Sequence, residues 1–264
     1  MESDINISHL LAAGFITRVE HHASLASTND HARRLAAAVG REETVLVVAD
    51  QQTAGRGRGQ NRWWTGSGAL ACSLLLDPAL RNIERRHFHL ISLAAAMAIV
   101  DTAQPLVPAG QVGLHWPNDV FVNDRKLSGV LVEALADGRH IVGIGVNLNN
   151  LLAAAPAELC DVLTTLADIA GRPYDRTQVL AALLSGFDRV LAQLAVDAAG
   201  VAQRANALCL QHGRMITIES GNRVTSGSCI GIADDGALVL ETATGREKFY
   251  SGVLRKHGSS HEAD

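Results

Sequence analysis

Residues 50–76 read DQQTAGRGRGQNRWWTGSGALACSLLL. Alternating glycines and arginines and a pair of tryptophans separate two apolar runs, residues 44–49 and 69–76, which lack polar alternation and so predict strands buried on both faces. Glycine lets the backbone approach a ligand closely, and the forked guanidinium groups of Arg56 and Arg58 suit carboxylate or phosphate oxygens. The stretch predicts a loop that closes over a small acid and a nucleotide phosphate; a solvated surface loop is the alternative.

Helical and extended patterns alternate along the rest of the chain. Apolar residues at helical spacing predict helices at residues 29–39 and 84–103, and two or three more within 161–210. Residues 112–149 contain short apolar runs separated by Asn-Asp and Asp-Gly turns, which indicates an antiparallel meander. After residue 213 the runs are short and alternating, which is typical of a small five-stranded β module of the SH3 or OB kind.

The composition narrows the class of protein. The chain has 264 residues, 47% of them apolar and 19% charged, as in ordinary soluble globular proteins. Its formal net charge of -4 argues against a general nucleic-acid-binding protein, which needs positive charge to replace phosphate counterions. The cysteines form no C-x-x-C pair, which predicts reduced thiols rather than a zinc or redox motif. They are Cys72, Cys160, Cys209 and Cys229. Residues 1–22 show neither a signal peptide nor a membrane span, so a cytoplasmic location is expected.

Two short segments allow both a structural and a functional interpretation. Ser27, Thr28 and Asn29 are preferred helix N-caps, and the same side chains could offer hydroxyl and amide groups to a small polar ligand. Trp63 and Trp64 are expected to divide their roles, one packing in the core and the other stacking on a flat ring.

Further polar residues interrupt the meander. The segment His115-Trp116-Pro117-Asn118-Asp119 by itself predicts only a turn. Lys126 opens an apolar strand in which Gly129 leaves space, so its ammonium group is expected to project from the sheet and to act as a point charge on a phosphoryl group. Gly143 and Gly145 interrupt a strong strand, which predicts a bulge or a closely approaching ligand.

Taken in order, these segments resemble the biotin protein ligases from about Ser24 to Leu254. That family has a Ser-Thr-Asn segment, a Gly-Arg-Gly-Arg loop ending in Trp, a Lys-Trp-Pro-Asn-Asp segment, a Lys-Leu-x-Gly-Ile-Leu-Val-Glu strand and a Gly-x-Gly-x-Asn segment. The corresponding residues here are Ser27 to Asn29, Gly55 to Arg58 with Trp63, His115 to Asp119, Lys126 to Glu133, and Gly143 to Asn147.

The resemblance implies an α+β fold: a mixed sheet flanked by helices, of the class II synthetase-like biotin/lipoyl ligase type, followed by a small SH3-like β-barrel. The corresponding boundaries are residues 1–211 for the catalytic domain and 212–257 for the barrel, with a disordered tail at 258–264. Such a minimal form, without an N-terminal DNA-binding domain, predicts no binding to DNA and none to membranes.

The resemblance also implies roles for individual residues. Lys126 and Arg58 would be catalytic. The residues that would bind biotin are Ser27, Thr28, Asn29, Gln52, Arg56, Gly57, Arg58, Lys126, Gly129 and Gly143. Those that would bind the adenylate are Gly55, Arg58, Trp63, Asn118, Asp119 and Asn147. No fixed metal site is implied, because Mg²⁺ would arrive with ATP.

The implied reaction has two steps. Biotin and ATP form biotinyl-5'-AMP, and biotin then passes to a lysine of the biotin carboxyl carrier protein or domain of acetyl-CoA carboxylase. A lipoate or octanoate ligase or transferase of the same fold is the alternative, although the Arg-Arg-x-x-Gly-Gly stretch of that group is missing. A homodimer, formed through an exposed sheet edge, is compatible with the sequence.

Two positions depart from the family pattern. His115 replaces the first lysine of the Lys-Trp-Pro-Asn-Asp segment, so a group that titrates near neutral pH is expected to tune activity between pH 6 and 8. Residues 59–62, GQNR, replace a segment richer in arginine and glycine, which predicts a change in how the adenylate is retained.

Overall fold

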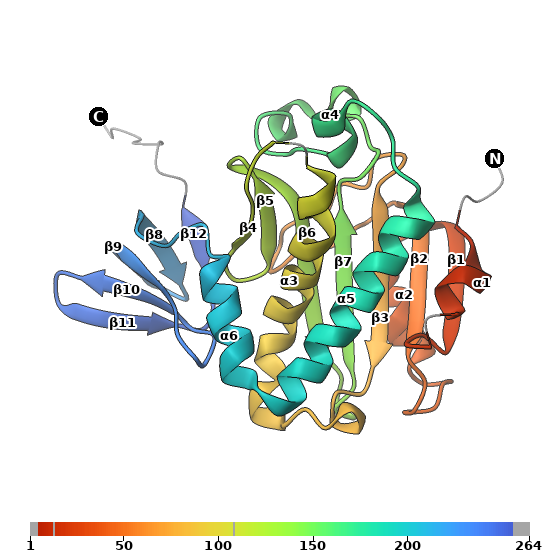
Figure 1. Ribbon diagram of the computed structural model, residues 1–264, viewed down its shortest axis with the longest axis horizontal. Helices are drawn as coiled ribbons and strands as arrows, with labels where there is room; N and C mark the ends of the chain where they lie inside the picture. Colours follow the sequence, from red (N-terminus) through yellow and green to blue (C-terminus); the bar gives the residue numbers. More distant parts are fainter. Residues whose placement is uncertain (1–4, 13, 108, 256–264) are drawn as a thin grey trace.

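A computed structural model describes residues 5–12, 14–107 and 109–255; the tail predicted at 258–264 lies outside them. A seven-stranded sheet forms the centre of the molecule, with the strand order β1-β2-β3-β7-β6-β5-β4 (Figure 1). β1 and β2 are parallel and all other neighbours are antiparallel, so the sheet is mixed as predicted. The strands are β1 (Arg18–Leu25), β2 (Val45–Gln52), β3 (Leu70–Leu76), β4 (Val112–His115), β5 (Asp119–Val122), β6 (Arg125–Ala134) and β7 (His140–Val146).

Helices cover both faces of this sheet. The α-helices are α1 (Ile7–Leu11), α2 (Thr28–Leu35), α3 (Ile91–Ala103), α4 (Leu166–Ala170), α5 (Arg176–Val196) and α6 (Ala198–Ala207). Short 3₁₀ helices are η1 (Ala79–Arg81), η2 (Arg85–Leu90), η3 (Gln104–Leu106), η4 (Leu152–Ala154) and η5 (Ala157–Leu159). α3 and α5 lie together across one face, whereas α2 packs against β2, β3 and β7 on the other (Figure 1).

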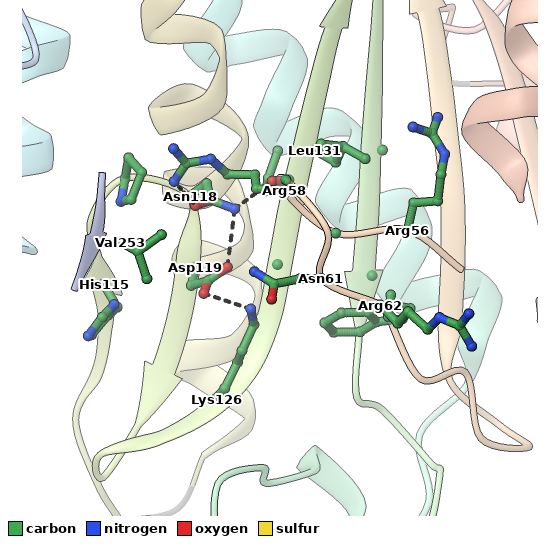
Figure 2. A pocket seen from close by; sticks show the side chains of 18 of the residues that line it. Arg56, Arg58, Asn61, Arg62, His115, Asn118, Asp119, Lys126, Leu131 and Val253 are labelled. Atoms are coloured by element: carbon green, nitrogen blue, oxygen red, sulfur yellow. Dashed lines mark hydrogen bonds and ion pairs between the residues drawn. The ribbon is translucent and has the colours of Figure 1, made fainter. Parts of the chain in front are cut away.

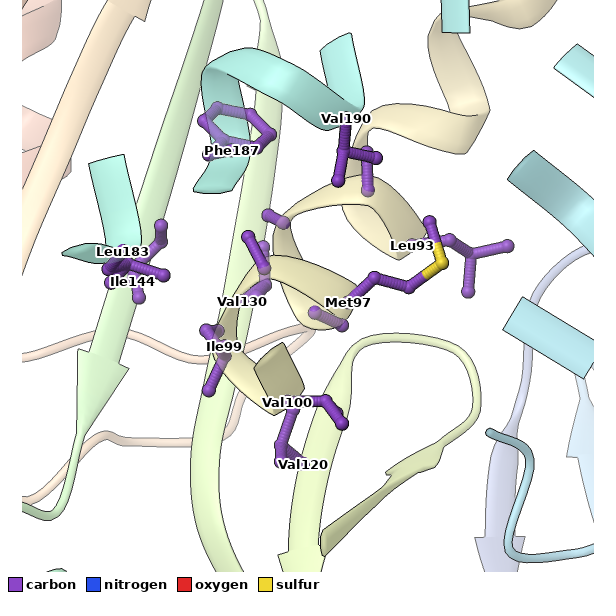
Figure 3. Packing of buried hydrophobic residues seen from close by; sticks show 14 of the residues in the cluster. Leu93, Met97, Ile99, Val100, Val120, Val130, Ile144, Leu183, Phe187 and Val190 are labelled. Atoms are coloured by element: carbon purple, nitrogen blue, oxygen red, sulfur yellow. The ribbon is translucent and has the colours of Figure 1, made fainter. Parts of the chain in front are cut away.

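α3 is apolar around most of its circumference because it is buried between the sheet and α5. Met97 and Ile99 are fully or almost fully buried, and they pack with Val130, Ile144 and Phe187 in one continuous core (Figure 3). Residues 85–106 and α5 are long and apolar enough to cross a membrane by length and composition, but 61% and 50% of their most apolar windows are buried inside the protein. Packing in the core accounts for their apolar character.

The five strands of the C-terminal module form a second, antiparallel sheet in the order β11-β10-β9-β8-β12, which confirms the predicted five-stranded module. They are β8 (Met215–Ser220), β9 (Arg223–Ile232), β10 (Leu238–Thr242), β11 (Gly245–Phe249) and β12 (Val253–Arg255). Trp116 fixes this module to the larger sheet, because its buried indole Nε1 donates a hydrogen bond to the carbonyl oxygen of Gly236 at 3.1 Å.

Three local predictions were incomplete. β1 was missed because its sequence, RVEHHASL, is polar, as suits an edge strand exposed to water. α2 ends at Leu35 rather than at residue 39, since Arg139 donates hydrogen bonds to the carbonyl oxygens of Ala36 and Val39 and satisfies them outside a regular helix. The helix predicted from residue 84 begins as the 3₁₀ helix η2 and becomes α-helical only at Ile91.

Candidate active site

The loop of residues 53–69, the α2 face of the sheet and the C-terminal module enclose a cavity of about 570 Å³, a size typical of small-molecule sites. Every residue predicted for the site lines this cavity except Gly55. Gly55 instead shapes the loop: its carbonyl oxygen accepts a hydrogen bond from the backbone N–H of Trp63 at 3.0 Å, and a Cβ on Gly55 would lie 2.5 Å from the Trp63 carbonyl oxygen.

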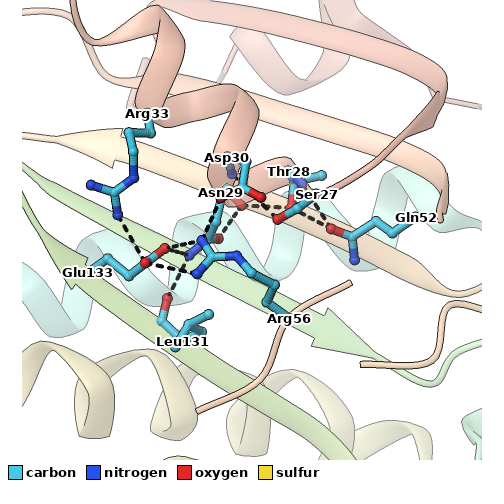
Figure 4. A network of polar contacts seen from close by, with 10 residues as sticks. Ser27, Thr28, Asn29, Asp30, Arg33, Gln52, Arg56, Leu131 and Glu133 are labelled. Carbon is cyan, nitrogen blue, oxygen red and sulfur yellow. Dashed lines mark hydrogen bonds and ion pairs between the residues drawn. The ribbon is translucent and has the colours of Figure 1, made fainter. Parts of the chain in front are cut away.

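A polar group lies where α2 begins (Figure 4). Ser27 is the N-cap of α2, and its Oγ accepts a hydrogen bond from the backbone N–H of Asp30 at 3.4 Å. Gln52 Oε1 accepts hydrogen bonds from the backbone N–H of Thr28 at 2.8 Å and from Thr28 Oγ1 at 3.1 Å. Ser27 to Asn29 therefore both begin α2 and line the cavity, because the start of the helix faces the cavity.

Ser73, which the sequence analysis missed, supports this group from β3. Its buried hydroxyl lies 2.6 Å from Asn29 Oδ1 and 2.7 Å from Thr28 Oγ1. The available signal was its position as the one hydroxyl side chain in the buried run LACSLLL, because a buried polar side chain needs a polar partner.

Arg56 is held by acidic residues on the rim of the cavity (Figure 4). Its guanidinium group forms a two-point contact with Glu133, at 3.1 and 2.7 Å, and lies 2.8 Å from Asp30 Oδ1. The hydrogen bond to Glu133, although opposed by burial, raises the pKa of Arg56. Burial opposes ionisation of Glu133, but hydrogen bonds from Arg56 and Asn29 outweigh it and hold the pKa of Glu133 below its usual value. Arg56 thus anchors the loop to α2 and β6.

The loop itself is an ordered hairpin. Arg56 and Arg62 form a β-bridge, and the backbone N–H of Gly57 donates to the carbonyl oxygen of Asn61 at 2.8 Å. Gly59 turns the chain with a φ of +61°, a left-handed conformation that suits glycine. Residues 59–62, which depart from the family pattern, therefore form the turn and the return strand of this hairpin.

A chain of charged and amide side chains crosses the cavity from Arg58 to Lys126 (Figure 2). Arg58 Nη1 donates to Asn118 Oδ1 at 3.0 Å, and Asn118 Nδ2 donates to Asp119 Oδ1 at 3.2 Å. Lys126 Nζ lies 2.6 Å from Asp119 Oδ2. Burial lowers the pKa of Arg58, and Asp119 partly opposes that effect; the guanidinium group remains charged at neutral pH. Two cations are therefore held on either side of one carboxylate.

A β-bulge in β6 directs Lys126 into the cavity. Val120 of β5 pairs with Ser128, but the next residue, Phe121, pairs with Lys126, so Leu127 is the extra residue on β6. If side chains alternated regularly between the two faces of β6, Lys126 would lie on the face opposite Gly129, because the two residues are three positions apart. Because of the bulge, Lys126 shares the face of Gly129 and Asp119.

Trp63 lies against the sheet inside the cavity. Gly145 makes room for it, since a Cβ there would lie 2.3 Å from Trp63 Cε2. Gly143 makes room in the same way for Asn29. The predicted close approach at these glycines is therefore made by side chains of the protein itself. Trp63 Nε1 is buried against Gly145 and has no hydrogen-bond partner within the described ranges, so the ring face and not the indole N–H is the part of Trp63 that a ligand could meet.

The predicted division of roles between the two tryptophans is wrong. Trp63 and Trp64 are both half-buried and both line the cavity, and the tryptophan in the core is Trp116, which is 2% exposed. Trp63 and Trp64 lie outside any regular strand, so polar and apolar residues do not alternate around them. The sequence therefore could not show which of the two side chains is buried.

We expect Gly145→Ala to displace Trp63 from the sheet, because the added Cβ would overlap the indole ring. The affinity for the adenylate that the resemblance implies should fall by about 10-fold or more, the contribution of one aromatic stacking contact. Isothermal titration with a non-hydrolysable biotinyl-AMP analogue measures the loss. Gly186→Ala in α5 is the matched control, since its backbone is not left-handed and its Cβ would meet its nearest atom at 3.7 Å, an ordinary contact. Equal losses in both variants would contradict the role of Trp63.

His115 stacks on Phe121 with ring centroids 4.3 Å apart, beside Asp119 on the cavity face. Burial lowers the pKa of His115 below its usual value of 6.5, although Asp119 partly opposes this effect. The lowered pKa favours the neutral imidazole ring, so the titration that the sequence suggested between pH 6 and 8 shifts toward more acidic pH. Protonation begins only as the pH falls through its lowered pKa.

We expect the rate of the adenylate formation that the resemblance implies to depend on His115 only on the acidic side of the usual histidine pKa of 6.5, since burial lowers the pKa of this ring. His115→Lys should remove this dependence on the acidic side, because lysine is charged throughout. Rates of pyrophosphate release from pH 5 to 8 test this prediction, and His115→Gln, which is neutral throughout, is the control. A wild-type inflection between pH 7 and 8 that both variants remove would contradict it.

The C-terminal module supplies a wall of the cavity that the sequence analysis did not predict. Its contribution consists of Glu219, Ser220, Gly221, Ser251, Gly252, Val253 and Leu254. Arg58 Nη1 reaches the carbonyl oxygen of Gly252 at 3.5 Å, 194 residues further along the chain. Cys72 also lines the cavity, and burial raises the pKa of its thiol to about 12, so it stays protonated.

Asn147 supports the backbone of Lys126 rather than presenting a free amide group. Its side chain is buried, with Nδ2 3.5 Å from the carbonyl oxygen of Lys126 and Oδ1 accepting a hydrogen bond from Asn150 at 3.0 Å. The backbone N–H of Lys126 also donates to the carbonyl oxygen of Val162 at 2.8 Å. These contacts fix the strand end from which the lysine projects.

Comparisons with known proteins agree with this architecture. Residues 23–149 match the biotin/lipoate A/B protein ligase family, and residues 212–253 match the biotin protein ligase C-terminal domain. The chain is 33% identical over 230 residues to the biotin--[acetyl-CoA-carboxylase] ligase of Paracoccus denitrificans, covering 84% of this chain and 93% of that protein. It is 34% identical over 240 residues to the bifunctional ligase/repressor of Bacillus subtilis, covering 89% of this chain and 72% of that protein.

A solved structure of a biotin protein ligase has a fold similar to that of this chain. The biotin protein ligase from Aquifex aeolicus in complex with biotin and ATP is similar with a TM-score of 0.79 and 28% identity, covering 91% of this chain and all of that one. Both sheets, the ordered motifs and these relatives agree. The chain therefore belongs to the biotin protein ligase family.

Proposed function

We propose that this protein joins biotin to ATP as biotinyl-5'-AMP and then transfers biotin to one lysine of a biotin carboxyl carrier protein of the acetyl-CoA carboxylase type. The observation that carries the proposal is the arrangement of two unlike groups along β6. A neutral polar group, Thr28 with Gln52, lies at one end of the cavity, and the pair of cations Arg58 and Lys126 lies at the other.

The spacing of these groups suits an elongated ligand. Asn29 contacts β6 at the carbonyl oxygen of Leu131, five residues beyond Lys126, which corresponds to about 15 Å along a strand. Gly129, Leu131, Gly143 and Trp63 line the cavity between the two ends, and Leu131 and Trp63 supply its apolar surface. Biotin would place its ureido ring at the neutral end and its carboxylate beside the cations, next to the phosphates of ATP.

The first step needs positive charge more than it needs an acid or a base. A carboxylate oxygen of biotin attacks the α-phosphorus of ATP, a new P–O bond forms, and the bond to the pyrophosphate leaving group breaks. Lys126 and Arg58 would neutralise the charge that spreads over the phosphoryl oxygens, and Mg²⁺ would enter with ATP as part of the substrate. Asp119 would keep both cations in place before the substrates bind.

The second step needs protection from water. The amine of the carrier lysine attacks the acyl carbon of the mixed anhydride, and AMP leaves with the electrons of the broken C–O bond. The hairpin anchored by Arg56 and the wall contributed by the C-terminal module cover the cavity on two sides, and they would keep the anhydride from hydrolysis until the carrier docks. Trp63 lines the cavity, and its ring would stack on the adenylate.

Two relatives support the carrier assignment, since those of Paracoccus denitrificans and Mycobacterium tuberculosis are named biotin--[acetyl-CoA-carboxylase] ligases. The match of residues 212–253 to the biotin protein ligase C-terminal domain favours biotin over lipoate. The cytoplasmic location, the absence of DNA and membrane binding, and the homodimer stay predictions from the sequence.

One experiment tests both steps. The protein is incubated with ATP, Mg²⁺ and either biotin or lipoate, and the acyl adenylate is sought by mass spectrometry before and after addition of a biotin carboxyl carrier domain. We expect biotinyl-AMP with biotin only, and a mass increase of one biotin on the carrier. Formation of lipoyl-AMP alone, or an adenylate that never reaches the carrier, would contradict the proposal.

A further inference from the structure

A cluster of two histidines and one glutamate lies outside the cavity, where β1 meets α2. Glu20 and His22 are two residues apart on the edge strand and so project from the same face of the sheet, and His31 of α2 packs against them. The three ligand-type atoms lie within 4.8 Å of one another. The rings of His22 and His31 are 4.5 Å apart between centroids.

The hydrogen bonding of this cluster is incomplete. His31 Nε2 lies 2.7 Å from Glu20 Oε2, which is a hydrogen bond. His22 Nε2 lies 3.6 Å from the same oxygen, too far for one, and this nitrogen is buried without a hydrogen-bond partner in the described part of the chain. A buried ring nitrogen that is left unpaired costs free energy, so its position beside two other donor atoms calls for an explanation.

The distances fit a tetrahedral metal ion. Zn²⁺ binds imidazole nitrogen and carboxylate oxygen at about 2.0 to 2.2 Å, so its ligand atoms stand about 3.3 Å from one another. The observed separations of Glu20 Oε2 from His31 Nε2 and from His22 Nε2, 2.7 and 3.6 Å, lie on either side of that value. The three atoms together span up to 4.8 Å, so the side chains of His22 and His31 must rotate to bring their nitrogens to the roughly 3.3 Å that one ion requires.

We propose that Glu20, His22 and His31 form a binding site for Zn²⁺ or a similar divalent transition metal, with water as the fourth ligand. Two imidazoles and one carboxylate suit Zn²⁺ rather than Mg²⁺, which prefers six oxygen ligands. The site is separate from the Mg²⁺ that would accompany ATP. It would clamp α2 to the edge strand, and α2 carries Ser27 to Asn29 at its start, one turn from His31.

Two arginines next to the cluster affect the affinity for a metal ion in opposite directions. Arg18 Nη2 holds the other carboxylate oxygen of Glu20 at 2.5 Å, which orients Oε2 toward the histidines. Arg34 Nη2 lies 3.4 Å from His31 Nδ1, the nitrogen that must carry the proton when Nε2 binds a metal. Arg34 is exposed on α2 and can turn toward water, but its positive charge opposes a dication.

The test is a titration of the untagged full chain with Zn²⁺ in buffer that contains excess Mg²⁺, followed by isothermal calorimetry and thermal unfolding. We expect one Zn²⁺ per chain and a rise in Tm of roughly 5 °C at a hundredfold excess over Kd. His22→Ala should weaken binding by about 100-fold, because loss of a direct ligand exceeds the loss of an outer contact. His9→Ala, on the exposed face of α1, is the matched histidine control and should bind as the unaltered chain does.

A second variant distinguishes a specific Zn²⁺ site from nonspecific binding of Zn²⁺ to the protein surface. Arg34→Gln removes a like charge without removing a ligand, so it should tighten Zn²⁺ binding several-fold. Co²⁺ substitution should give the visible absorption of a tetrahedral ion, and His31→Ala should abolish that absorption. Binding that is unchanged in His22→Ala, a stoichiometry well below one, or octahedral Co²⁺ spectra would overturn the proposal and leave the His31–Glu20 hydrogen bond as the whole function of the cluster.

Discussion

Replacement of Lys126 by alanine is expected to lower the biotin-dependent release of pyrophosphate from MgATP by about 100- to 1,000-fold, the usual effect of removing one charge-stabilising donor from a reaction centre. The ammonium group stands on the cavity face of β6 through the bulge at Leu127, 2.6 Å from Asp119 and 5.9 Å from the centre of the Trp63 ring. Its removal takes away positive charge and leaves the Asp119 carboxylate without its direct cationic partner where the phosphates would lie.

A double variant separates these two effects. Lys126→Ala combined with Asp119→Asn should recover part of the activity if repulsion by Asp119 contributes, and none of it if the lost cation accounts for the whole effect. Lys248→Ala is the matched control, because Lys248 also pairs with an aspartate, Asp235 at 2.8 Å, but lies outside the cavity. Release of pyrophosphate at a near-normal rate by Lys126→Ala would remove this residue from the mechanism.

Replacement of Arg58 by alanine is expected to release biotinyl-AMP into solution, where it would label lysines of bystander proteins. Arg58 is the residue that joins the hairpin, the turn at Asn118 and the C-terminal module, through contacts of 3.0 Å to Asn118 and 3.5 Å to Gly252. Loss of a charge-assisted hydrogen bond to the phosphate should increase the dissociation rate of the adenylate by about 10- to 100-fold.

The measurement compares biotin on the carrier with biotin on an unrelated protein in the same tube. Arg246→Ala is the control, since Arg246 pairs with Glu241 on the exposed side of the C-terminal module. Arg58→Lys keeps the positive charge but loses the two-point hydrogen bonding of the guanidinium group, so this variant should retain the adenylate to an intermediate degree. Labelling that stays confined to the carrier in Arg58→Ala would show that the hairpin retains the adenylate without this side chain.

Much of the site could be predicted from the sequence because its polar residues interrupt apolar segments. Lys126, Gly129, Gly143 and Asn147 stand out against strands that are otherwise apolar, and Arg58 stands between two buried strands. All of them line the cavity. The same reasoning missed β1, because the polar sequence of an edge strand carries no burial signal.

By itself, the amino-acid sequence determined the mixed α+β architecture, the meander and those cavity residues that lie in the catalytic domain motifs, but not the wall contributed by the C-terminal module. Their partners depended on the tertiary structure, since Arg56 finds Glu133 at a separation of 77 residues and Arg58 finds Gly252 at 194. The bulge at Leu127 decided that Lys126 faces the cavity, because a single extra residue on a strand reverses the face of every side chain beyond it. Periodicity along one strand carries no information about the register of its neighbour, and that register placed the ammonium group of Lys126 beside Asp119 in the cavity.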